Sequence, residues 1–300
     1  MGRCTDNHVP GMWHRLQIVA VFLLPVAIIG GLYLLGLTLP VPVLGRDYVV
    51  RLELPEAGER VGLPPVEGPD DPSRPLVVID AGHGGHDPGA VGLGIREKTL
   101  TLGLARALRD ELLRQGGVRV ALTRSDDTFL VLEERSEIAR QLGADLFLSI
   151  HADSAGEKDE VTGASIYTLS ERASSEAAAR FAARENSADV INGVVLTGRS
   201  DAVNTILVDL AQRRASGSSA QFVDLVLREG DGMLRFHPQA RRSAALVVLR
   251  APDVPSVLYE SGFVTNPEDA ARLASPEGRQ RFAEVMARAI RIYFAREAGT

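Results

Sequence analysis

Residues Val77 to Lys98 read VVIDAGHGGHDPGAVGLGIREK, and residues Leu146 to Ser154 read LFLSIHADS. Each stretch is a short, partly β-branched apolar run that ends in a polar loop carrying a histidine. Buried strands of an α/β sheet have this pattern, and ligands and catalytic groups gather where parallel strands end. His83 and His151 are therefore expected at such strand ends.

Strands and helices alternate on both sides of these stretches. We expect strands at Leu76–Asp80, Arg119–Thr123, Leu146–Ile150, Ala164–Leu169 and Ser256–Glu260, and helices at Leu100–Gln115, Leu132–Leu142 and Arg279–Arg296. This order predicts an α/β fold with a mixed, largely parallel sheet flanked by helices on both faces. A folded part of about 220 residues has the size of one domain, so residues 75–300 are expected to form a single domain.

The beginning of the chain differs from globular sequence. Residues 16–40 contain no charged side chain and are long and apolar enough to span a bilayer. Arg3 and Arg15 precede this segment, which places residues 1–15 in the cytoplasm and the remainder outside it. A cleaved signal peptide is the alternative interpretation, but the apolar run is longer than usual and lacks a small-x-small site. We therefore expect a transmembrane anchor.

Composition limits the class of protein. The net charge of −6 gives no reason to expect a basic face that binds nucleic acid. Cys4 is the only cysteine, so the chain cannot form an internal disulfide. Residues 41–74 are rich in proline, glycine and acids and are expected to be a linker, since few apolar side chains offset the entropy of ordering them.

His83, His151 and Glu97 form a possible metal-binding set. Two imidazoles and a carboxylate suit catalytic zinc, which leaves its fourth position for water. Glu97 also lies where a helix starts, and the helix dipole favours a carboxylate there in any case. His86 is the alternative to His83 in the same loop. Asp153 is a possible fourth ligand, but hydrolysis needs an open position, so a role in stabilising its loop is preferred.

These two stretches, together with APDVPSVLYESGFVTNPEDAARL at residues 251–273, resemble the zinc-dependent N-acetylmuramoyl-L-alanine amidases of the amidase_3 family. The resemblance begins near Pro75, reaches the C-terminus and extends to the cell-division type. It implies that residues 75–300 are an amidase catalytic domain with a Zn²⁺ cofactor. The implied reaction is hydrolysis of the amide between N-acetylmuramic acid and L-alanine in bacterial peptidoglycan, for cell-wall remodelling and daughter-cell separation.

The resemblance also assigns residues and a location. His83, Glu97 and His151 match the family's metal ligands, whereas His86 matches none of them. Glu260, which ends the strand SVLYE before SGFVTN, matches the catalytic glutamate that acts as general base and acid. With the anchor, the catalytic domain is expected in the periplasm, attached to the inner membrane. The alternative, signal cleavage, gives a secreted enzyme.

Three further residues are candidates around this site. Asp80, at the end of the first strand, is a candidate to orient a ligand histidine, although it also suits a simple turn. Arg124 and Arg135 match basic positions of the family. They are expected either to bind substrate carboxylates or to form salt bridges on a helix surface.

Residues 171–232 form a predicted helical insert between two strands of the sheet. The segment ERASSEAAARFAARENSADVI, residues 171–191, predicts a helix capped by Ser174 or Ser175. A second helical run is expected at Ala202–Arg213. These helices are either ordinary packing on the sheet or a segment that controls the site.

The second interpretation rests on the resemblance to cell-division amidases, in which such an insert covers the active site until an activator protein moves it. A carboxylate from the insert that reached the metal would take the position of the reacting water. Glu171 is the first candidate for this inhibitory ligand, and Glu176 is the second.

Two other functions remain open from the residues alone. A zinc peptidase that acts within the peptidoglycan stem peptide would use the same ligand chemistry. A catalytically inactive wall-binding regulator would keep only the fold. The joint presence of His83, Glu97, His151 and Glu260 speaks against an inactive protein.

Overall fold

The computed structural model describes residues 62–156, 160–188, 190–191, 194–195 and 205–299, with four isolated residues nearer the N-terminus. Residues from 62 onward belong to one compact unit, Arg60–Thr300. The predicted anchor at residues 16–40 lies outside the described residues, apart from isolated positions. Within the part of the chain that is described, no helix is both long and apolar enough to cross a bilayer.

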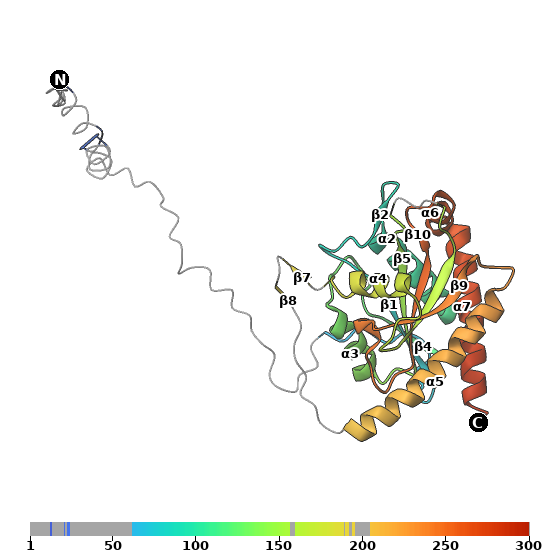
Figure 1. Ribbon diagram of the computed structural model, residues 1–300. Coiled ribbons are helices and arrows are strands. Elements are labelled where there is room, and N and C mark those ends of the chain that lie inside the picture. The colour runs from blue at the N-terminus through green and yellow to red at the C-terminus, as the bar shows by residue number, and fades with distance from the viewer. Residues whose placement is uncertain are drawn as a thin grey trace. The chain divides into compact units, whose positions relative to one another are not determined.

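A six-stranded sheet forms the centre of this unit (Figure 1). In spatial order its strands are β4 (Arg119–Leu122), β1 (Leu76–Ala81), β5 (Leu146–Asp153), β10 (Ser256–Phe263), β6 (Ala164–Leu169) and β9 (Phe236–Ala244). Neighbouring strands are parallel except β10 and β6, which are antiparallel. The predicted α/β class, with a mixed and largely parallel sheet, is confirmed.

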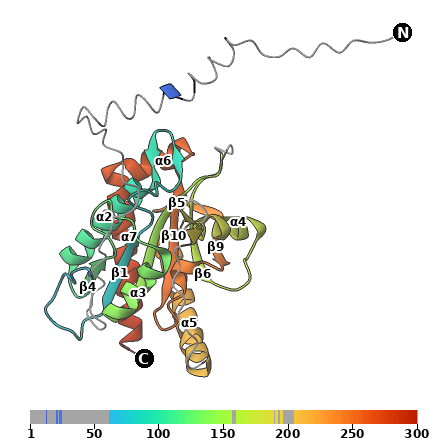
Figure 2. The same ribbon diagram turned by 90° about the vertical axis from the view of Figure 1, so that its left-hand side faces the viewer.

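Helices cover both faces of the sheet, as Figure 2 shows. One face carries α2 (Glu97–Gln115), α5 (Thr205–Gly230) and α7 (Pro276–Glu297), and the other carries α3 (Leu132–Leu142), α4 (Glu176–Glu185) and the 3-10 helix η1 (Val247–Leu249). The remaining elements are α6 (Pro267–Ala274) and two short hairpins, β2 (Val91–Gly92) with β3 (Ile95–Arg96) and β7 (Val190–Ile191) with β8 (Val194–Val195).

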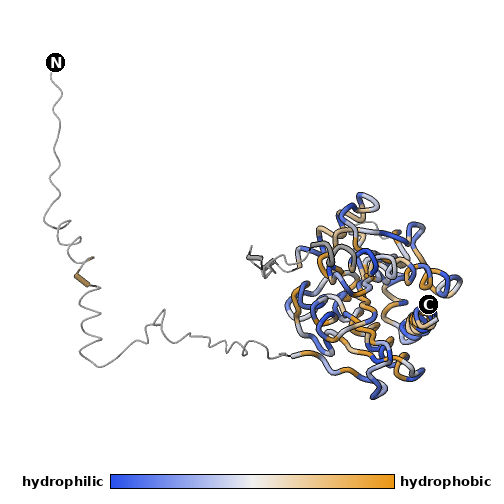
Figure 3. The backbone as a smooth tube through the Cα atoms, turned by 90° about the horizontal axis from the view of Figure 1, so that it is seen from below, coloured by the Kyte–Doolittle hydropathy of each residue, from blue (hydrophilic) through white to orange (hydrophobic). Residues whose placement is uncertain are grey.

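The strand β1 explains why both faces need helices. All of its residues are buried. Val77 and Ile79 belong to the core beneath α2, α5 and α7, whereas Leu76 and Val78 belong to the core beneath α3 and α4. A strand buried on both faces has a continuous apolar sequence instead of an alternating one. Figure 3 shows the same distribution, with apolar segments in orange running through the interior.

The folded unit begins earlier than the sequence predicts. Residues 62–74, assigned above to the linker, contain Glu67, which exchanges two backbone hydrogen bonds with Val120 of β4. The side chain of Arg119 donates to the carbonyl oxygens of Pro72 and Arg74. The end of the predicted linker is thus held against the edge of the sheet.

The predicted elements are present, and several have different ends. β5 and β10 continue to Asp153 and Phe263, beyond their predicted last residues. Ser175, one of the two predicted caps, accepts a hydrogen bond from the backbone N–H of Ala178 at the start of α4. The second helix of the insert, α5, extends to Gly230, far beyond the predicted run. The insert therefore consists of α4, the β7–β8 hairpin and α5.

Candidate metal and catalytic centre

The two predicted histidines meet where β1 and β5 end. Their ring centroids lie 4.9 Å apart at 73°, and His83 and His151 are only 7% and 3% exposed. Gly82 permits this approach, since a Cβ there would lie 2.5 Å from the His151 ring. His83 has a φ of 62°, a left-handed conformation that is uncommon outside glycine and that concentrates at functional sites. The backbone thus turns His83 toward His151.

Asp87 orients the ring of His83. Its Oδ2 lies 2.7 Å from His83 Nδ1, and its Oδ1 accepts from the backbone N–H of Gly89. A carboxylate on one ring nitrogen fixes the tautomer and turns the other nitrogen toward a metal. The sequence predicts this role for Asp80, whereas in the structure Asp87, four positions after the histidine, fulfils it.

Glu97 lies between the two imidazoles. Its Oε2 is 3.1 Å from His83 Nε2, and its Oε1 is 3.2 Å from His151 Nδ1. Each oxygen also accepts one backbone N–H, from Ala90 and Ala152 at 2.8 Å. The first turn of α2, the loop at Ala90 and the strand β5 therefore fix this carboxylate, which is 2% exposed. The structure brings the three predicted ligands together.

A second carboxylate, Glu185, reaches the same point from α4. Its Oε2 lies 3.1 Å from His151 Nδ1 and 3.5 Å from His83 Nε2. One ligand atom from each of His83, His151 and Glu185 lies within 4.8 Å of the others. Glu185 is not among the residues predicted from the sequence.

The two predicted inhibitory residues lie elsewhere, which corrects their assignment. Glu171 is exposed, and the side chain of Glu176 is 87% exposed and pairs with Arg180. The buried residues of α4 are Ala178, Phe181, Ala182 and Glu185. They follow the i, i+3, i+4, i+7 spacing of one helix face. Glu176 is not on that face, and Glu171 precedes the helix. This spacing is the sequence signal that identifies Glu185.

Hydrogen bonds at both ends of α4 attach it to the end of β9 and to the start of η1. The backbone N–H of Ser243 donates to Ser174 Oγ. The side chain of Asn186 donates to the carbonyl of Ala245 at 2.8 Å and accepts from the N–H of Val247 at 2.9 Å. α4 is therefore attached by its ends and by its buried face.

Glu260 lies beside His151, its register partner on the neighbouring strand. It is 1% exposed, and within the described residues neither of its carboxyl oxygens has a hydrogen-bond partner. Burial raises the pKa of Glu260 well above its usual range, and the charges of Asp153 and Glu97 raise it further. A carboxyl group in this setting takes up a proton readily, as a general base must.

Asp153 pairs with Arg184, the neighbour of Glu185 on α4. Burial raises the pKa of Asp153 to about 7, with Arg184 acting in the opposite direction and Glu185 adding to the rise. Its carboxylate also accepts from the backbone N–H of Ser154. Asp153 therefore binds α4 through Arg184. This contact adds to the role in stabilising its own loop that the sequence predicts.

The neighbouring carboxylates stabilise the protonated, positively charged form of the two imidazoles. Burial alone lowers the pKa of each histidine, but the carboxylates outweigh it and raise both values to about 10. Glu97 and Asp87 act on His83, and Glu185 and Glu97 act on His151. Burial raises the pKa of Glu97, yet the two histidines hold it below its usual range. The cluster therefore favours a cation where the ring nitrogens converge.

Asp80, Arg124 and Arg135 support the loop that carries His83. Asp80 accepts from Arg135 at 2.8 Å and from the hydroxyl groups of Thr123 and Ser149 at 2.7 Å. Arg124 and Arg135 are 4% and 2% exposed. Their guanidinium groups donate to backbone carbonyl oxygens of Ala81, Gly82, His83, Lys98, Asp126 and Leu130.

Neither arginine forms a salt bridge on a helix surface, because both are buried and Arg135 pairs with the buried Asp80 instead. Their hydrogen bonds to loop carbonyl oxygens favour support of this loop over the predicted binding of substrate carboxylates. Burial, with the charge of Arg135, lowers the pKa of Arg124 to about 10. His86 stacks on Phe129 at 4.1 Å between ring centroids, which agrees with its assignment to the loop and not to the ligand set.

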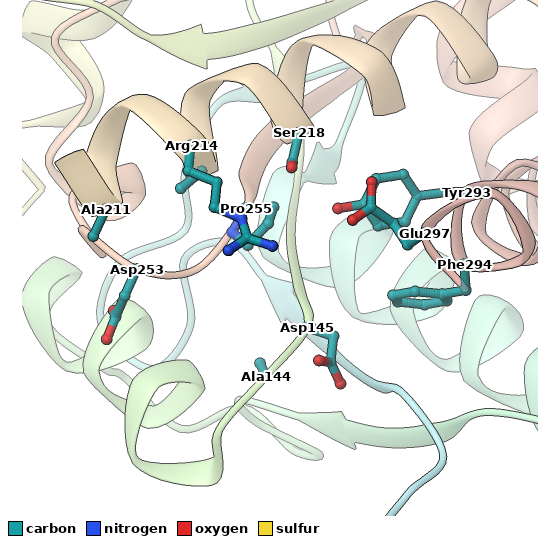
Figure 4. A pocket seen from close by; sticks show the side chains of 11 residues that line it. Ala144, Asp145, Ala211, Arg214, Ser218, Asp253, Pro255, Tyr293, Phe294 and Glu297 are labelled. Carbon is teal, nitrogen blue, oxygen red and sulfur yellow. The ribbon is translucent and has the colours of Figure 1, made fainter. Parts of the chain in front are cut away.

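One cavity lies at the opposite ends of the strands. It has a volume of about 670 Å³ and is lined by Asp145, Pro255 and Tyr293 among others; Figure 4 shows these side chains. Asp145 and Pro255 directly precede β5 and β10, so this cavity opens at the amino ends of the strands that carry His151 and Glu260 at their other ends. It therefore has no part in the histidine site.

Comparison with known proteins gives a consistent result. The Amidase_3 family model, described as N-acetylmuramoyl-L-alanine amidase, matches residues 77–291. The amidase AmiA of Salmonella typhimurium is 40% identical over 224 residues, which cover 74% of this chain and 77% of the relative. The amidase AmiC of Neisseria meningitidis serogroup B is 36% identical, over 73% of this chain and 53% of the relative.

Solved structures of amidases share the fold. The amidase AmiC2 of Nostoc punctiforme is 31% identical with a TM-score of 0.53, covering 74% of this chain and 97% of that one. The catalytic domain of CwlV from Bacillus (Paenibacillus) polymyxa var. colistinus is 28% identical with a TM-score of 0.52, covering 74% and 98%. The chain therefore belongs to the Amidase_3 family of N-acetylmuramoyl-L-alanine amidases.

Proposed function

We propose that the chain is a zinc-dependent hydrolase of the amide between N-acetylmuramic acid and L-alanine in peptidoglycan, acting in cell-wall remodelling and daughter-cell separation. The observation that carries this proposal is the convergence of His83, His151 and Glu97 beside the buried Glu260. Family membership supports the choice of substrate.

The residues present fit a zinc ion. His83 Nε2 and His151 Nδ1 are buried and, among the described residues, have no hydrogen-bond partner. Two imidazole nitrogens with one carboxylate are the set that catalytic zinc uses, with a fourth position left open. His83, His151 and Glu97 would hold the ion, while Asp87 and the backbone N–H groups on Glu97 keep the donors in place.

The chain's own groups account for the proton transfers of hydrolysis. Zinc, when bound, polarises the scissile carbonyl and makes water more acidic. A carboxyl oxygen of Glu260 takes the proton from the attacking water as the new C–O bond forms. Glu260 then gives that proton to the amide nitrogen as the C–N bond breaks, so the stem peptide leaves with a free amine. The carboxylate of Glu260 is regenerated, and one water molecule has been added across the amide bond.

Digestion of isolated peptidoglycan tests this proposal. The full chain, supplied with zinc, is incubated with the polymer, and the soluble products are analysed by mass spectrometry. Intact stem peptides that begin with L-alanine are expected. Products cut only within the stem peptide would identify a peptidase instead, and an absence of products even after activation would identify a non-catalytic protein.

We propose that α4 inhibits the enzyme until a partner protein displaces it. Glu185 contacts both ligand histidines, and Arg184 beside it contacts Asp153. A carboxylate at this point takes the place that the reacting water needs. The partner would act on α4 or on the segments that hold its ends.

Replacing Glu185 by alanine should raise amidase activity roughly tenfold or more in the absence of any partner, because the equilibrium no longer favours the blocked site. Product release from labelled peptidoglycan measures the effect. Glu176→Ala is the matched control, since this exposed residue of the same helix pairs with Arg180 and should leave the rate unchanged. Equal rates for the parent protein and Glu185→Ala would show that α4 is not inhibitory.

We propose that residues 16–40 anchor the protein in the inner membrane, with the catalytic domain in the periplasm. The uncharged apolar run and the preceding arginines support this topology. The protein should fractionate with the inner membrane, and protease added to spheroplasts should digest the catalytic domain. A soluble periplasmic form with a mature N-terminus near residue 41 would instead indicate signal cleavage.

A further inference from the structure

The stem peptide carries free carboxylates, and the site needs a cation to recognise one of them. Arg124 and Arg135 are excluded, because they hold the His83 loop. Lys98 pairs with Asp127, and Arg184 belongs to the helix that must leave the site. The sheet surface beneath α4 offers another cation.

Arg242 of β9 lies on that surface. It is the register partner of Tyr167 on β6, and Tyr167 in turn is opposite Leu258 on β10. Side chains alternate along a strand, so Leu258 and Glu260 point to the same face, as do Tyr167 and Arg242. Two strand spacings and two residue rises place the Cα atoms of Arg242 and Glu260 about 12 Å apart, a distance that the arginine side chain shortens.

The charge of Arg242 is not matched by a carboxylate in the described residues. Its guanidinium contacts Tyr167 Oη at 3.0 Å, His237 Nδ1 at 3.0 Å and the carbonyl of Gln239 at 2.9 Å. Nδ1 of His237 also accepts the backbone N–H of Gln239 at 3.0 Å, which makes it an acceptor toward Arg242 as well. Burial, together with the charge of Arg242, lowers the pKa of His237. All three partners are uncharged, and they hold the half-buried guanidinium in place.

α4 covers the same position with an aromatic ring. Phe181 stacks on Tyr167 with ring centroids 4.5 Å apart and planes at 25°, and Tyr167 is only 1% exposed. The guanidinium of Arg242 lies 5.8 Å from the Tyr167 ring centroid. Displacement of α4 would expose the face of the Tyr167 ring and the guanidinium of Arg242. Both would then lie on the same face of the sheet as Glu260.

We propose that Arg242 binds a free carboxylate of the stem peptide, with the Tyr167 ring beneath the peptide. The carboxylate of the second stem residue suits the distance between Glu260 and Arg242, since one residue of an extended peptide spans about 3.3–3.6 Å and the arginine side chain covers the rest. The enzyme would then favour stems whose second residue carries a carboxylate over stems in which it is a carboxamide. This inference rests on the proposed amidase function and on the displacement of α4.

Two synthetic substrates test Arg242 directly. Both are N-acetylmuramoyl tripeptides, and they differ only in a carboxylate or a carboxamide on the second residue. The full chain should prefer the carboxylate form. Arg242→Gln should raise KM for that form roughly tenfold to a hundredfold, as for loss of a charged hydrogen bond. The value of kcat should change little, because Arg242 lies away from the reacting atoms.

Neighbouring variants supply the controls. Arg242→Lys keeps the charge and should retain part of the preference for the carboxylate form. Arg241→Gln alters the adjacent arginine of β9, which pairs with Asp224 of α5, and should leave the preference intact. The carboxamide substrate reports folding, since hydrolysis of this form does not use the charge of Arg242.

All variants are measured alone and combined with Glu185→Ala. This separates the inhibition by α4 from the binding of a carboxylate by Arg242. No gain from Glu185→Ala contradicts the inhibition by α4 but leaves the ratio of the two substrates measurable. A parent enzyme that hydrolyses both forms equally well would overturn the role of Arg242. An unchanged preference in Arg242→Gln would do the same. If Arg242→Gln cannot fold, the substrate preferences of the parent and of Arg242→Lys decide the question.

Discussion

Replacing Glu260 by glutamine should lower turnover by about two to four orders of magnitude, the usual loss when a general acid and base is removed. Glutamine has nearly the same shape but cannot carry the transferred proton. The two oxygens of Glu260 are buried beside His151 and, among the described residues, have no hydrogen-bond partner. The fold and the zinc content should therefore survive the change. Turnover is measured in the Glu185→Ala background, so that α4 does not mask the effect.

The matched control is Glu268→Gln, which makes the same chemical change on α6. The Glu268 side chain is 72% exposed and pairs with Arg235, so its loss should leave turnover unchanged. A near-normal rate for Glu260→Gln, with zinc still bound, would show that another group moves the proton.

His151→Ala should abolish both tight zinc binding and amidase activity. The substitution removes one of the two imidazole nitrogens and leaves a void against Gly82, where the His151 ring now packs. Glu97 and Glu185 would lose the group that each contacts at Nδ1. Metal content after dialysis of the full chain and release of stem peptide are the two measurements.

His86→Ala is the control for this variant, because His86 stacks on Phe129 and does not contact the ligand set. It should keep zinc and activity. If His151→Ala retains stoichiometric zinc, His151 does not belong to the metal site.

Most of the sheet is predictable from local sequence, and β9 shows where such prediction ends. β1 and β5 have continuous apolar runs followed by polar loops, so their length and burial are visible in the sequence. β9 reads FHPQARRSA, with a proline and two arginines, and lies at the edge of the sheet. Edge strands tolerate such residues, so only the long-range pairing with β6 reveals it.

The candidate site shows a similar division. The sequence places His83, His151 and Glu260 where strands end, and the structure brings them together with Glu97. The role of Glu185 depends on where α4 packs, and no local pattern fixes that position. The sequence does show that Glu185 shares a helix face with Ala178, Phe181 and Ala182, the buried residues of α4. The buried carbonyls that Arg124 and Arg135 satisfy are equally invisible before the His83 loop is built.

If α4 inhibits the enzyme as proposed, its attachment sets how tightly the enzyme can be switched off. Apart from Glu185, its buried face contains one large side chain, Phe181, between two alanines. Burial of one such side chain contributes about 1.5–3 kcal/mol, which corresponds to a factor of roughly ten to a hundred in population. This apolar contact alone would let the helix open spontaneously from time to time, so the polar contacts at its ends and at Glu185 decide how rarely it opens. Under the proposed inhibition, each opening in a resting cell would allow some wall cleavage, which the cell must balance by synthesis.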